Sequence, residues 1–277
     1  MHARAAAARL RNAGKLLYPA AGFTKADVAE YYARVAPWLL PHLEGRAVVL
    51  RRFPEGIDAP GWYQTNCRGA PPWLRVADVA GRRGQRFRMC TFEDVASLLW
   101  AVELGTLEFH PFLWRLESPA QPTTVVFDLD PGPPADVVEC CEVALLLREL
   151  LGPDARAKTS GFVGLHVYAP HEGDTRRFAR ELAATLAADH PQLVVDTQRR
   201  TLRESRVLVD WLQNDPARQT VAPYSLRAAP FPTVSTPVTW EEVERCARER
   251  RPELLTFTAP MVLERLERVG DVFLTPG

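Results

Sequence analysis

The chain has 277 residues, 47% of them hydrophobic, and carries 34 basic and 34 acidic side chains. This length fits one domain or two closely packed halves, and the zero net charge gives no bulk attraction to nucleic acid. The longest apolar run is too short to span a membrane and no signal peptide precedes the first charges, so we expect a cytoplasmic protein. Five cysteines without a C-x-x-C pair predict reduced thiols rather than a zinc site, with Cys140 and Cys141 in the core.

The charges are unevenly distributed along the chain. Residues 1–52 hold nine Lys or Arg and three Asp or Glu, an excess of six positive charges. Such a segment suits a polyphosphate partner, although a solvated surface explains it equally well. Only three cationic residues in the whole chain are lysines, at Lys15, Lys25 and Lys158. Because lysine is a compact point charge and arginine a planar fork, these positions either prefer an ammonium group or have kept lysine by chance.

The first long element predicted is a helix over residues 24–40. Thr24 and Asp27 have the spacing of a capping box, and apolar residues follow at helical intervals. Lys25 then falls in the first turn, where the helix dipole disfavours a cation unless an anion lies nearby. We therefore expect either an anion next to Lys25 or a side chain that points into solvent.

Trp62 and Tyr63 follow a predicted strand over residues 47–53 and a Pro-Gly turn. Neighbours on a strand face opposite sides, so one ring is predicted in the core and the other exposed, where it could stack on a base. The alternative is that both rings pack in the core or at its rim. Other elements are predicted from capping residues and apolar periodicity. They are helices that start near 91, 136, 174, 239 and 260 and strands over residues 106–114 and 207–211.

The most informative segment is a β-prone run at residues 123–127 that leads into Asp128, Leu129 and Asp130 and then a Pro-Gly-Pro turn. Alternate residues of a strand share a face, so the two carboxylates project together at its end. Two like charges on one face repel unless a cation lies between them. In the alternative interpretation Asp130 caps the turn and Asp128 is solvated. Asp210 ends a second apolar strand.

A glycine-containing turn over residues 157–168 connects two short strand patterns and contains Lys158, Ser160 and His166. Small residues and backbone N–H groups suit a phosphate cradle, although a plain hairpin has the same pattern. The turn does not match a Walker A loop, because no Gly-Lys-Ser/Thr ends it and no long helix follows.

Together these segments resemble the primase-polymerase domain of bacterial ligase D, in the archaeo-eukaryotic primase superfamily. The likeness covers residues 10–270, and its motifs occur in the family's order. They are Lys15–Pro19, Thr24–Asp27, Arg52–Ile57, Glu108–Pro111, Phe127–Pro131, Lys158–Ser160 with His166, Val209–Asp215, Val221–Arg227 and Ser235–Trp240.

The resemblance implies a single primase-polymerase domain over residues 1–277 with a mixed α/β (α+β) fold. A largely antiparallel central sheet flanked by helices would carry the carboxylates, with an N-terminal α/β portion packed on it. Residues 1–120 would bind DNA ends, and residues 121–277 would form the catalytic portion. No Lys-x-Asp-Gly ligase motif is present, so the sequence corresponds to the polymerase part alone.

The implied function is template-directed nucleotidyl transfer, with ribonucleotides preferred, that fills gaps or extends ends during non-homologous end joining of double-strand breaks. Such transfer uses two cations about 3.5–4 Å apart, one at the attacking hydroxyl and one at the triphosphate. Carboxylates are the preferred ligands of hard divalent cations. Asp128, Asp130 and Asp210 are therefore expected to hold two Mn²⁺ or Mg²⁺ ions.

The resemblance also assigns binding residues and partners. The nucleotide would contact Arg52, His110, Ser160, His166 and Arg227, a downstream DNA 5′-phosphate would contact Lys15 and Lys25, and template bases would stack on Trp62 and Tyr63. The expected partners are DNA with 5′-phosphorylated gaps or ends, nucleoside triphosphates, and separate ligase and end-binding proteins, in a nucleoid-associated cytoplasmic setting.

The sequence departs from the family pattern at the loop Gly161–Gly164, where Phe162 and Val163 replace a Gly-Lys pair. A cation near the nucleotide is lost and bulk is gained. Two alternative functions remain open on sequence grounds. One is a primase that starts chains de novo, and the other is a non-catalytic module that binds 5′-phosphorylated DNA ends.

Overall fold

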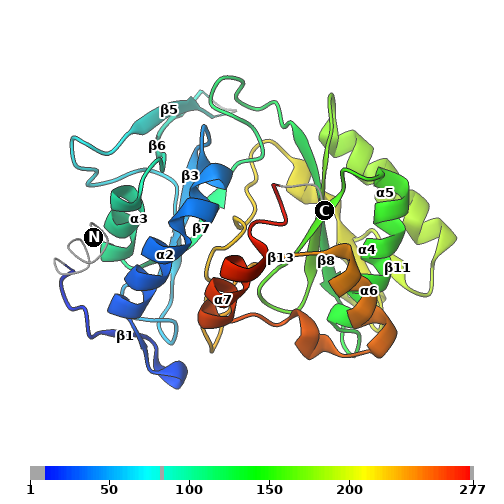
Figure 1. The fold of residues 1–277 in the computed structure, drawn as a ribbon. Helices are drawn as coiled ribbons and strands as arrows, with labels where there is room; N and C mark the ends of the chain where they lie inside the picture. Colours follow the sequence, from blue (N-terminus) through cyan, green and yellow to red (C-terminus); the bar gives the residue numbers. More distant parts are fainter. Residues whose placement is uncertain (1–9, 82–83, 275–277) are drawn as a thin grey trace. The chain divides into compact units, whose positions relative to one another are not determined.

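The computed structural model describes residues 10–81 and 84–274, which form two compact units (Figure 1). The first unit comprises the described parts of Met1–Pro119, Gln219–Ser235 and Phe257–Gly270. The second comprises the described parts of Ala120–Arg218, Thr236–Thr256 and Asp271–Gly277. The chain thus leaves the first unit, builds most of the second, and returns twice to the first.

The first unit is built around strand β3 (Val48–Arg52), which pairs in antiparallel fashion with three other strands. Its partners are β4 (Trp62–Gln64), β7 (Thr106–Pro111) and β6 (Arg86–Cys90), and β6 also pairs with β5 (Val76–Ala80). The unit also contains the small pair β1 (Leu16–Tyr18) and β2 (Phe23–Thr24) and the helices α2 (Lys25–Leu43), α3 (Val95–Glu103) and α7 (Ala259–Val269).

Helix α2 turns a long apolar face toward the core of the first unit. Val28, Tyr32, Val35 and Leu39 recur at helical spacing and are fully buried. The Tyr32 ring meets Phe109 of β7 edge-to-face, with the ring centroids 4.9 Å apart, and its hydroxyl donates to the Leu107 carbonyl. This packing fixes β7 under α2, and β7 carries one of the polar clusters described below.

Helix α3 starts later than the sequence indicates. The prediction placed its first cap at Thr91, but the side chain that accepts from the N3 amide, Ser97, is that of Asp94. Thr91, three residues before this cap, instead donates its hydroxyl to the Arg75 carbonyl. Both residues are good cap formers, and the tertiary contact of Thr91 decides between them.

Cys67 and Cys90 form a disulfide, so the prediction that all thiols are reduced is wrong for this pair. The bond joins the segment after β4 to the end of β6, which are 23 residues apart in sequence. The other three cysteines, Cys140, Cys141 and Cys246, are free and buried. The expected core positions of Cys140 and Cys141 are confirmed.

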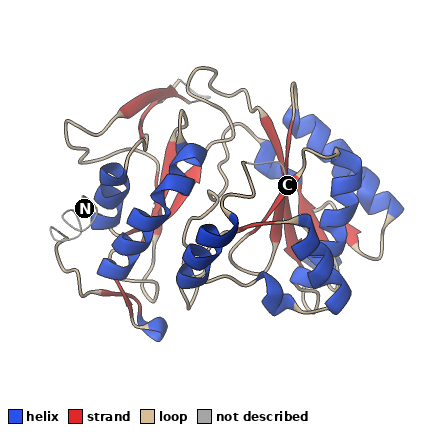
Figure 2. Ribbon diagram, in the orientation of Figure 1, coloured by secondary structure: helices blue, strands red, loops and turns tan. Residues whose placement is uncertain are grey.

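The second unit contains a six-stranded sheet in the order β11-β12-β8-β10-β9-β13. Figure 2 draws the strands in red and the helices in blue. Every neighbouring pair is antiparallel except β11 and β12. The strands are β8 (Thr124–Pro131), β9 (Arg156–Thr159), β10 (Leu165–Pro170), β11 (Val194–Val195), β12 (Val207–Asp210) and β13 (Pro237–Val238). The predicted mixed α/β fold with a largely antiparallel sheet that carries the carboxylates is confirmed.

Three α-helices belong to the second unit: α4 (Val137–Leu151), α5 (Thr175–Asp189) and α6 (Trp240–Glu249). Helix α4 packs on β8, β10 and α6, and α5 packs on β8 and β11. Asp136 with Glu139 and Thr239 with Glu242 form capping boxes at the starts of α4 and α6, as the sequence pattern predicts.

Short 3-10 turns complete the described chain at Pro19–Ala21 (η1), Arg200–Leu202 (η2), Trp211–Asn214 (η3) and Pro252–Leu255 (η4). Strands β5 and β6 were not predicted, because each has at most two buried residues and β6 alternates arginines with apolar residues. Across residues 10–81 and 84–274, no helix combines the length and the apolar character needed to cross a membrane.

Candidate active site

The three predicted carboxylates lie on two adjacent strands of the second unit. Asp128 and Asp130 are on β8, and Asp210 is the last residue of β12. The antiparallel register sets Asp210 directly opposite Asp128, and Leu208 opposite Asp130. Directly opposed residues in such a pair have Cβ atoms about 4.5–5.5 Å apart, on the same face of the sheet. The register therefore brings together three side chains that are up to 82 positions apart in the chain.

Gln213 bridges two of these carboxylates. Its side-chain nitrogen donates to Oδ2 of Asp128 and to Oδ2 of Asp210, at 3.3 Å in both cases. The turn η3 starts directly after β12 and positions Gln213, because Oδ1 of Asp210 accepts from the Leu212 amide and caps that turn. A partly positive amide group thus lies between two carboxylate oxygens.

The electrostatics of the cluster reflect its crowding. Partial burial and then the neighbouring charge of Asp128 raise the pKa of Asp130 to about 6. Burial also raises the pKa of Asp210, with a further contribution from Asp128. Arg203 offers partial compensation, with a guanidinium nitrogen 3.7 Å from Oδ2 of Asp130. Without a further positive charge, the three groups do not all ionise easily near neutral pH.

The donors of the cluster are of the kind that hard divalent cations bind. Carboxylate oxygens are the preferred ligands of Mg²⁺ and Mn²⁺, and the amide of Gln213 already occupies a position between two of them. In the part of the chain that the structure describes, no group of three His, Cys, Asp or Glu side chains is arranged to hold a metal ion directly. The carboxylates are instead turned toward Gln213, Arg203 and His166.

His166 lies on β10, between two charged residues of the neighbouring strands. It is the register partner of Asp128 on β8 and of Lys158 on β9. Its Nε2 lies 3.2 Å from Oδ1 of Asp128, and its Nδ1 lies 3.2 Å from Nζ of Lys158. The hydroxyl of Tyr168 is 3.4 Å from the same Nδ1. Three strands thus line up one lysine, one histidine and one carboxylate.

Ser160 lies in the loop that connects β9 and β10, so the predicted hairpin is present. Its hydroxyl accepts from the amides of Phe162 and Gly164, at 3.2 and 3.1 Å. Glycine is required at position 164, because a Cβ there would lie 2.1 Å from the Leu129 carbonyl oxygen. Phe162 and Val163 are exposed at the tip of the loop.

In the first unit a second polar cluster surrounds Glu108 of β7, which is fully buried. One carboxylate oxygen lies 2.8 Å from Nε2 of His110 and 3.7 Å from Nε of Arg227. The other accepts from Arg51 and from the Ala228 amide, both at 2.9 Å. Burial alone raises the pKa of a carboxyl, but the hydrogen bond from His110 and the charge of Arg227 outweigh it and lower the pKa of Glu108 to about 2.

Trp62 and Tyr63 both remain exposed, at 47% and 54%, which corrects the prediction that one ring is in the core. They do face opposite sides of β4, but that short strand leaves both sides open to solvent. The guanidinium of Arg52 lies 5.2 Å from the Trp62 ring, and that of Arg51 lies 5.4 Å from the Tyr63 ring. Burial lowers the pKa of Arg52, which donates to the Leu104 carbonyl.

Lys15 and Lys25 are close through their backbones, because the Lys25 amide donates to the Lys15 carbonyl at 2.8 Å. The anion expected near Lys25 is Glu103, whose carboxylate lies 2.6 Å from Nζ. Lys25 is buried, whereas Lys15 is partly exposed and pairs with the exposed Glu55 at 2.6 Å. Of these two lysines, Lys15 is therefore the one with an accessible ammonium group.

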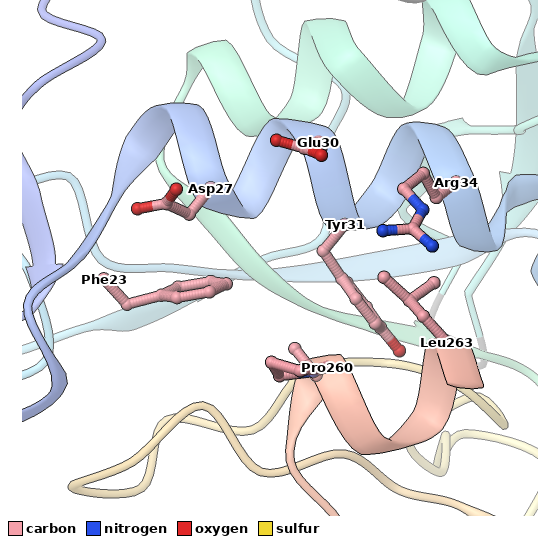
Figure 3. A pocket seen from close by; sticks show the side chains of 8 residues that line it. Phe23, Asp27, Glu30, Tyr31, Arg34, Pro260 and Leu263 are labelled. Carbon is pink, nitrogen blue, oxygen red and sulfur yellow. The ribbon is translucent and has the colours of Figure 1, made fainter. Parts of the chain in front are cut away.

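A separate pocket lies between α2 and α7 in the first unit (Figure 3). Tyr31 and Arg34 line it from α2, and Pro260 and Leu263 line it from α7. Two of its polar groups have partners within the unit, since Tyr31 donates to the Tyr224 carbonyl and Arg34 pairs with Glu267. None of the residues that the sequence assigned to DNA or nucleotide lines it.

Sequence reasoning gave no role to Glu108, Lys158 or Gln213. The signal for Glu108 was available, because it lies two positions before His110 on a predicted strand and so shares its face. Gln213 lies within the motif around Asp210. Lys158 could be suspected only from the scarcity of lysine, and its contact with His166 depends on the register of β9 and β10.

Comparison with known proteins gives one consistent result. A family model described as "LigD, primase-polymerase domain" matches residues 24–273. The multifunctional non-homologous end joining protein LigD of Mycobacterium bovis is 37% identical over 280 residues. The bifunctional LigD of Bacillus subtilis is 29% identical over 268 residues. The alignments cover 95% and 94% of this chain but only 36% and 42% of those proteins.

A solved structure also matches. It is the polymerase domain of Mycobacterium tuberculosis ligase D in complex with DNA, with a TM-score of 0.87, 37% sequence identity and 95% coverage of both chains. The similarity thus extends over the whole of a polymerase domain and not over the remainder of the longer relatives. With its carboxylate cluster on β8 and β12, the chain belongs to the LigD primase-polymerase domain family, a family of metal-dependent nucleotidyltransferases.

Proposed function

We propose that this chain is a template-directed nucleotidyltransferase that extends a primer 3′ end, with ribonucleotides preferred, and fills gaps during non-homologous end joining of double-strand breaks. The observation that carries the proposal is the register of β8 and β12, which sets Asp210 opposite Asp128 and adds Asp130 on the same face. Membership in the family supports the reaction class.

In the proposed mechanism Asp128, Asp130 and Asp210 hold two divalent ions, Mn²⁺ or Mg²⁺. When bound, such ions supply charge stabilisation at the triphosphate and favour deprotonation of the attacking hydroxyl. Asp128 and Asp130 share one face of β8, and Asp210 joins them from β12. The raised pKa of Asp130 is consistent with a cluster that gains from added positive charge.

We further propose that the incoming nucleotide is contacted by Arg52, His110, Ser160, His166 and Arg227. A guanidinium can bind phosphate oxygens in a bidentate manner, which suits Arg227. Trp62 and Tyr63 would stack on template bases, since both rings are exposed and each lies near an arginine. Lys15, with the buried Lys25 behind it, would bind the 5′-phosphate at the downstream edge of a gap.

The proposed setting is the bacterial cytoplasm close to the nucleoid, with 5′-phosphorylated DNA ends and nucleoside triphosphates as substrates. Separate ligase and end-binding proteins would act beside the chain. This part of the proposal follows from the names of the relatives, which describe end joining. Residues 1–120 would bind DNA ends and residues 121–277 would catalyse the transfer, as parts of one functional domain.

The test is Mn²⁺-dependent primer extension on a gapped template. Asp128→Ala or Asp210→Ala should abolish nucleotide addition and leave DNA binding intact, because the substitutions remove ligands and not DNA contacts. Asp154→Ala, an exposed carboxylate in the turn after α4, is the matched control and should extend normally. Normal extension by the Asp128 and Asp210 variants would refute the assignment.

Two outcomes would favour the alternative functions. Chain synthesis on a template without a primer would indicate a de novo primase. Absence of extension by the unmodified protein, together with binding that requires a 5′-phosphate, would indicate a non-catalytic end-binding module.

A further inference from the structure

The three lysines of this chain lie in very different environments, and Lys158 is the extreme case. Its side chain is fully buried on β9, between β10 and β13 of the sheet. Burying an ammonium group is costly unless other groups receive its hydrogen bonds and charge. Nδ1 of His166 lies 3.2 Å from Nζ of Lys158, and the centroid of the Tyr168 ring lies 5.7 Å from the same Nζ.

Donor and acceptor chemistry fixes the direction of the contacts around His166. An ammonium group only donates, so with Lys158 protonated Nδ1 of His166 accepts from it and carries no proton. The proton of the neutral ring is then on Nε2, which faces Oδ1 of Asp128 at 3.2 Å. An ionised carboxylate only accepts, so the contact with Asp128 and the contact with Lys158 both require the Nε2–H tautomer of His166.

We propose that Lys158 is a positioning residue for the metal site, through His166 and Asp128. The ammonium group holds the imidazole in its Nε2–H tautomer, and the imidazole holds Oδ1 of Asp128. Oδ2 of the same carboxylate is then directed toward Gln213, which also contacts Asp210. The inference rests on the proposed function only in that Asp128 is taken to be a metal ligand.

The positions of these three residues on adjacent strands hold their side chains in a fixed row. Lys158, His166 and Asp128 are consecutive register partners across β9, β10 and β8. Each side chain therefore stands on the same face with its neighbour directly beside it. Groups that orient a ligand from behind usually affect metal affinity or activity about 10–100-fold when they are removed.

The direct readout is the tautomer of His166 in the metal-free protein. Long-range ¹H–¹⁵N correlation spectra of protein labelled with ¹⁵N-histidine distinguish Nε2–H from Nδ1–H. We expect Nε2–H in the unmodified protein. Observation of the Nδ1–H tautomer there would overturn the proposal without any variant, so the test does not depend on whether a substituted protein folds.

Lys158→Met keeps the length of the side chain and removes its donor. We expect the Nε2–H preference to be lost, Mn²⁺ affinity to fall about 10–100-fold, and kcat to fall more than KM for the nucleotide. Lys158→Arg restores a donor-only group and should recover the tautomer. Tyr168→Phe, which removes the hydroxyl that lies 3.4 Å from Nδ1, is the matched control and should keep the tautomer and the Mn²⁺ affinity.

An unchanged tautomer with Mn²⁺ affinity within about threefold in Lys158→Met would overturn the proposal, because second-sphere loss should exceed that. Loss of the tautomer in Tyr168→Phe alone would overturn it as well, since the tyrosine would then be the determinant. If the unmodified protein extends no primer, the proposed function fails, while the spectra still decide the role of Lys158.

Discussion

Substitution of the buried Glu108 tests how much the polar cluster of the first unit contributes to its stability. The pKa of this carboxyl is lowered from 4.5 to about 2 in the folded protein. At about 1.36 kcal/mol per pKa unit, the ionised form is stabilised by about 3 kcal/mol relative to the unfolded chain. Because the side chain has no exposed surface, solvent screening does not reduce this figure much.

Glu108→Gln keeps the shape of the side chain and removes its charge. Near pH 7 the variant should therefore lose about 3 kcal/mol of unfolding free energy. A lowered pKa means that the stabilisation is complete above pH 4.5 and is lost as the pH falls toward about 2. At about pH 3.5 the difference between the two proteins should shrink to about 2 kcal/mol, because the unfolded carboxyl is mostly protonated there.

Amide hydrogen exchange in β3 and β7 measures this difference within the first unit, at pH 7 and pH 3.5. Glu55→Gln is the control, because its exposed carboxylate pairs with Lys15 at 2.6 Å and an exposed pair contributes only about 0–1 kcal/mol. The reasoning would be refuted if Glu108→Gln lowered the unfolding free energy by less than about 1 kcal/mol at pH 7. It would also be refuted if the loss were the same at pH 3.5 as at pH 7.

Three further changes have defined outcomes. Trp62→Ala with Tyr63→Ala should weaken template binding by about 1–3 kcal/mol per unstacked base, measured by fluorescence anisotropy, with little change in urea unfolding because both rings are exposed. Lys15→Ala should remove the preference for 5′-phosphorylated gaps in binding assays while primer extension on ungapped templates continues. Gly164→Ala should destabilise the second unit by about 1–3 kcal/mol in urea unfolding, since its Cβ would lie 2.1 Å from the Leu129 carbonyl oxygen.

Lys25 is a poor choice for such a binding experiment, although sequence reasoning paired it with Lys15. Its ammonium group donates to the carbonyls of Arg11 and Glu103, at 3.0 and 2.8 Å, and pairs with the Glu103 carboxylate. Removing it takes a donor away from each of these partly buried acceptors, which is destabilising in itself. Lost phosphate recognition in a Lys25 variant would therefore not separate binding from folding.

The carboxylate cluster could be predicted because each of its parts has a local signal. Period-two spacing puts Asp128 and Asp130 on one face, and an apolar run that ends in Asp210 marks a second strand. The order of motifs along the chain then indicated that the strands meet. The pairing of Asp210 with Asp128 itself is a matter of register, which these local patterns do not encode.

Other features were beyond sequence reasoning for physical reasons. The disulfide between Cys67 and Cys90 closes 23 residues of chain, and neither cysteine has a local pattern that indicates a partner. Sequence reasoning assigned Arg52 a role at the nucleotide and assigned its neighbour Arg51 none. In the structure it is Arg51 that forms an ion pair with the buried Glu108. A register irregularity between these two arginines separates their environments, and a strand pattern does not reveal it.

Glu108 and Lys158 share a physical property that explains why each can order its surroundings. Both are charged and fully buried, so neither can exchange its protein partners for water without opening the structure. An exposed charge has no such constraint, and its contacts are weak and interchangeable. In each unit a buried charge thus forces the adjacent polar groups into one arrangement: His110, Arg51 and Arg227 around Glu108, and His166 beside Lys158. Such fixed polar groups are what catalysis requires, because they need no reorganisation when charge develops on a substrate.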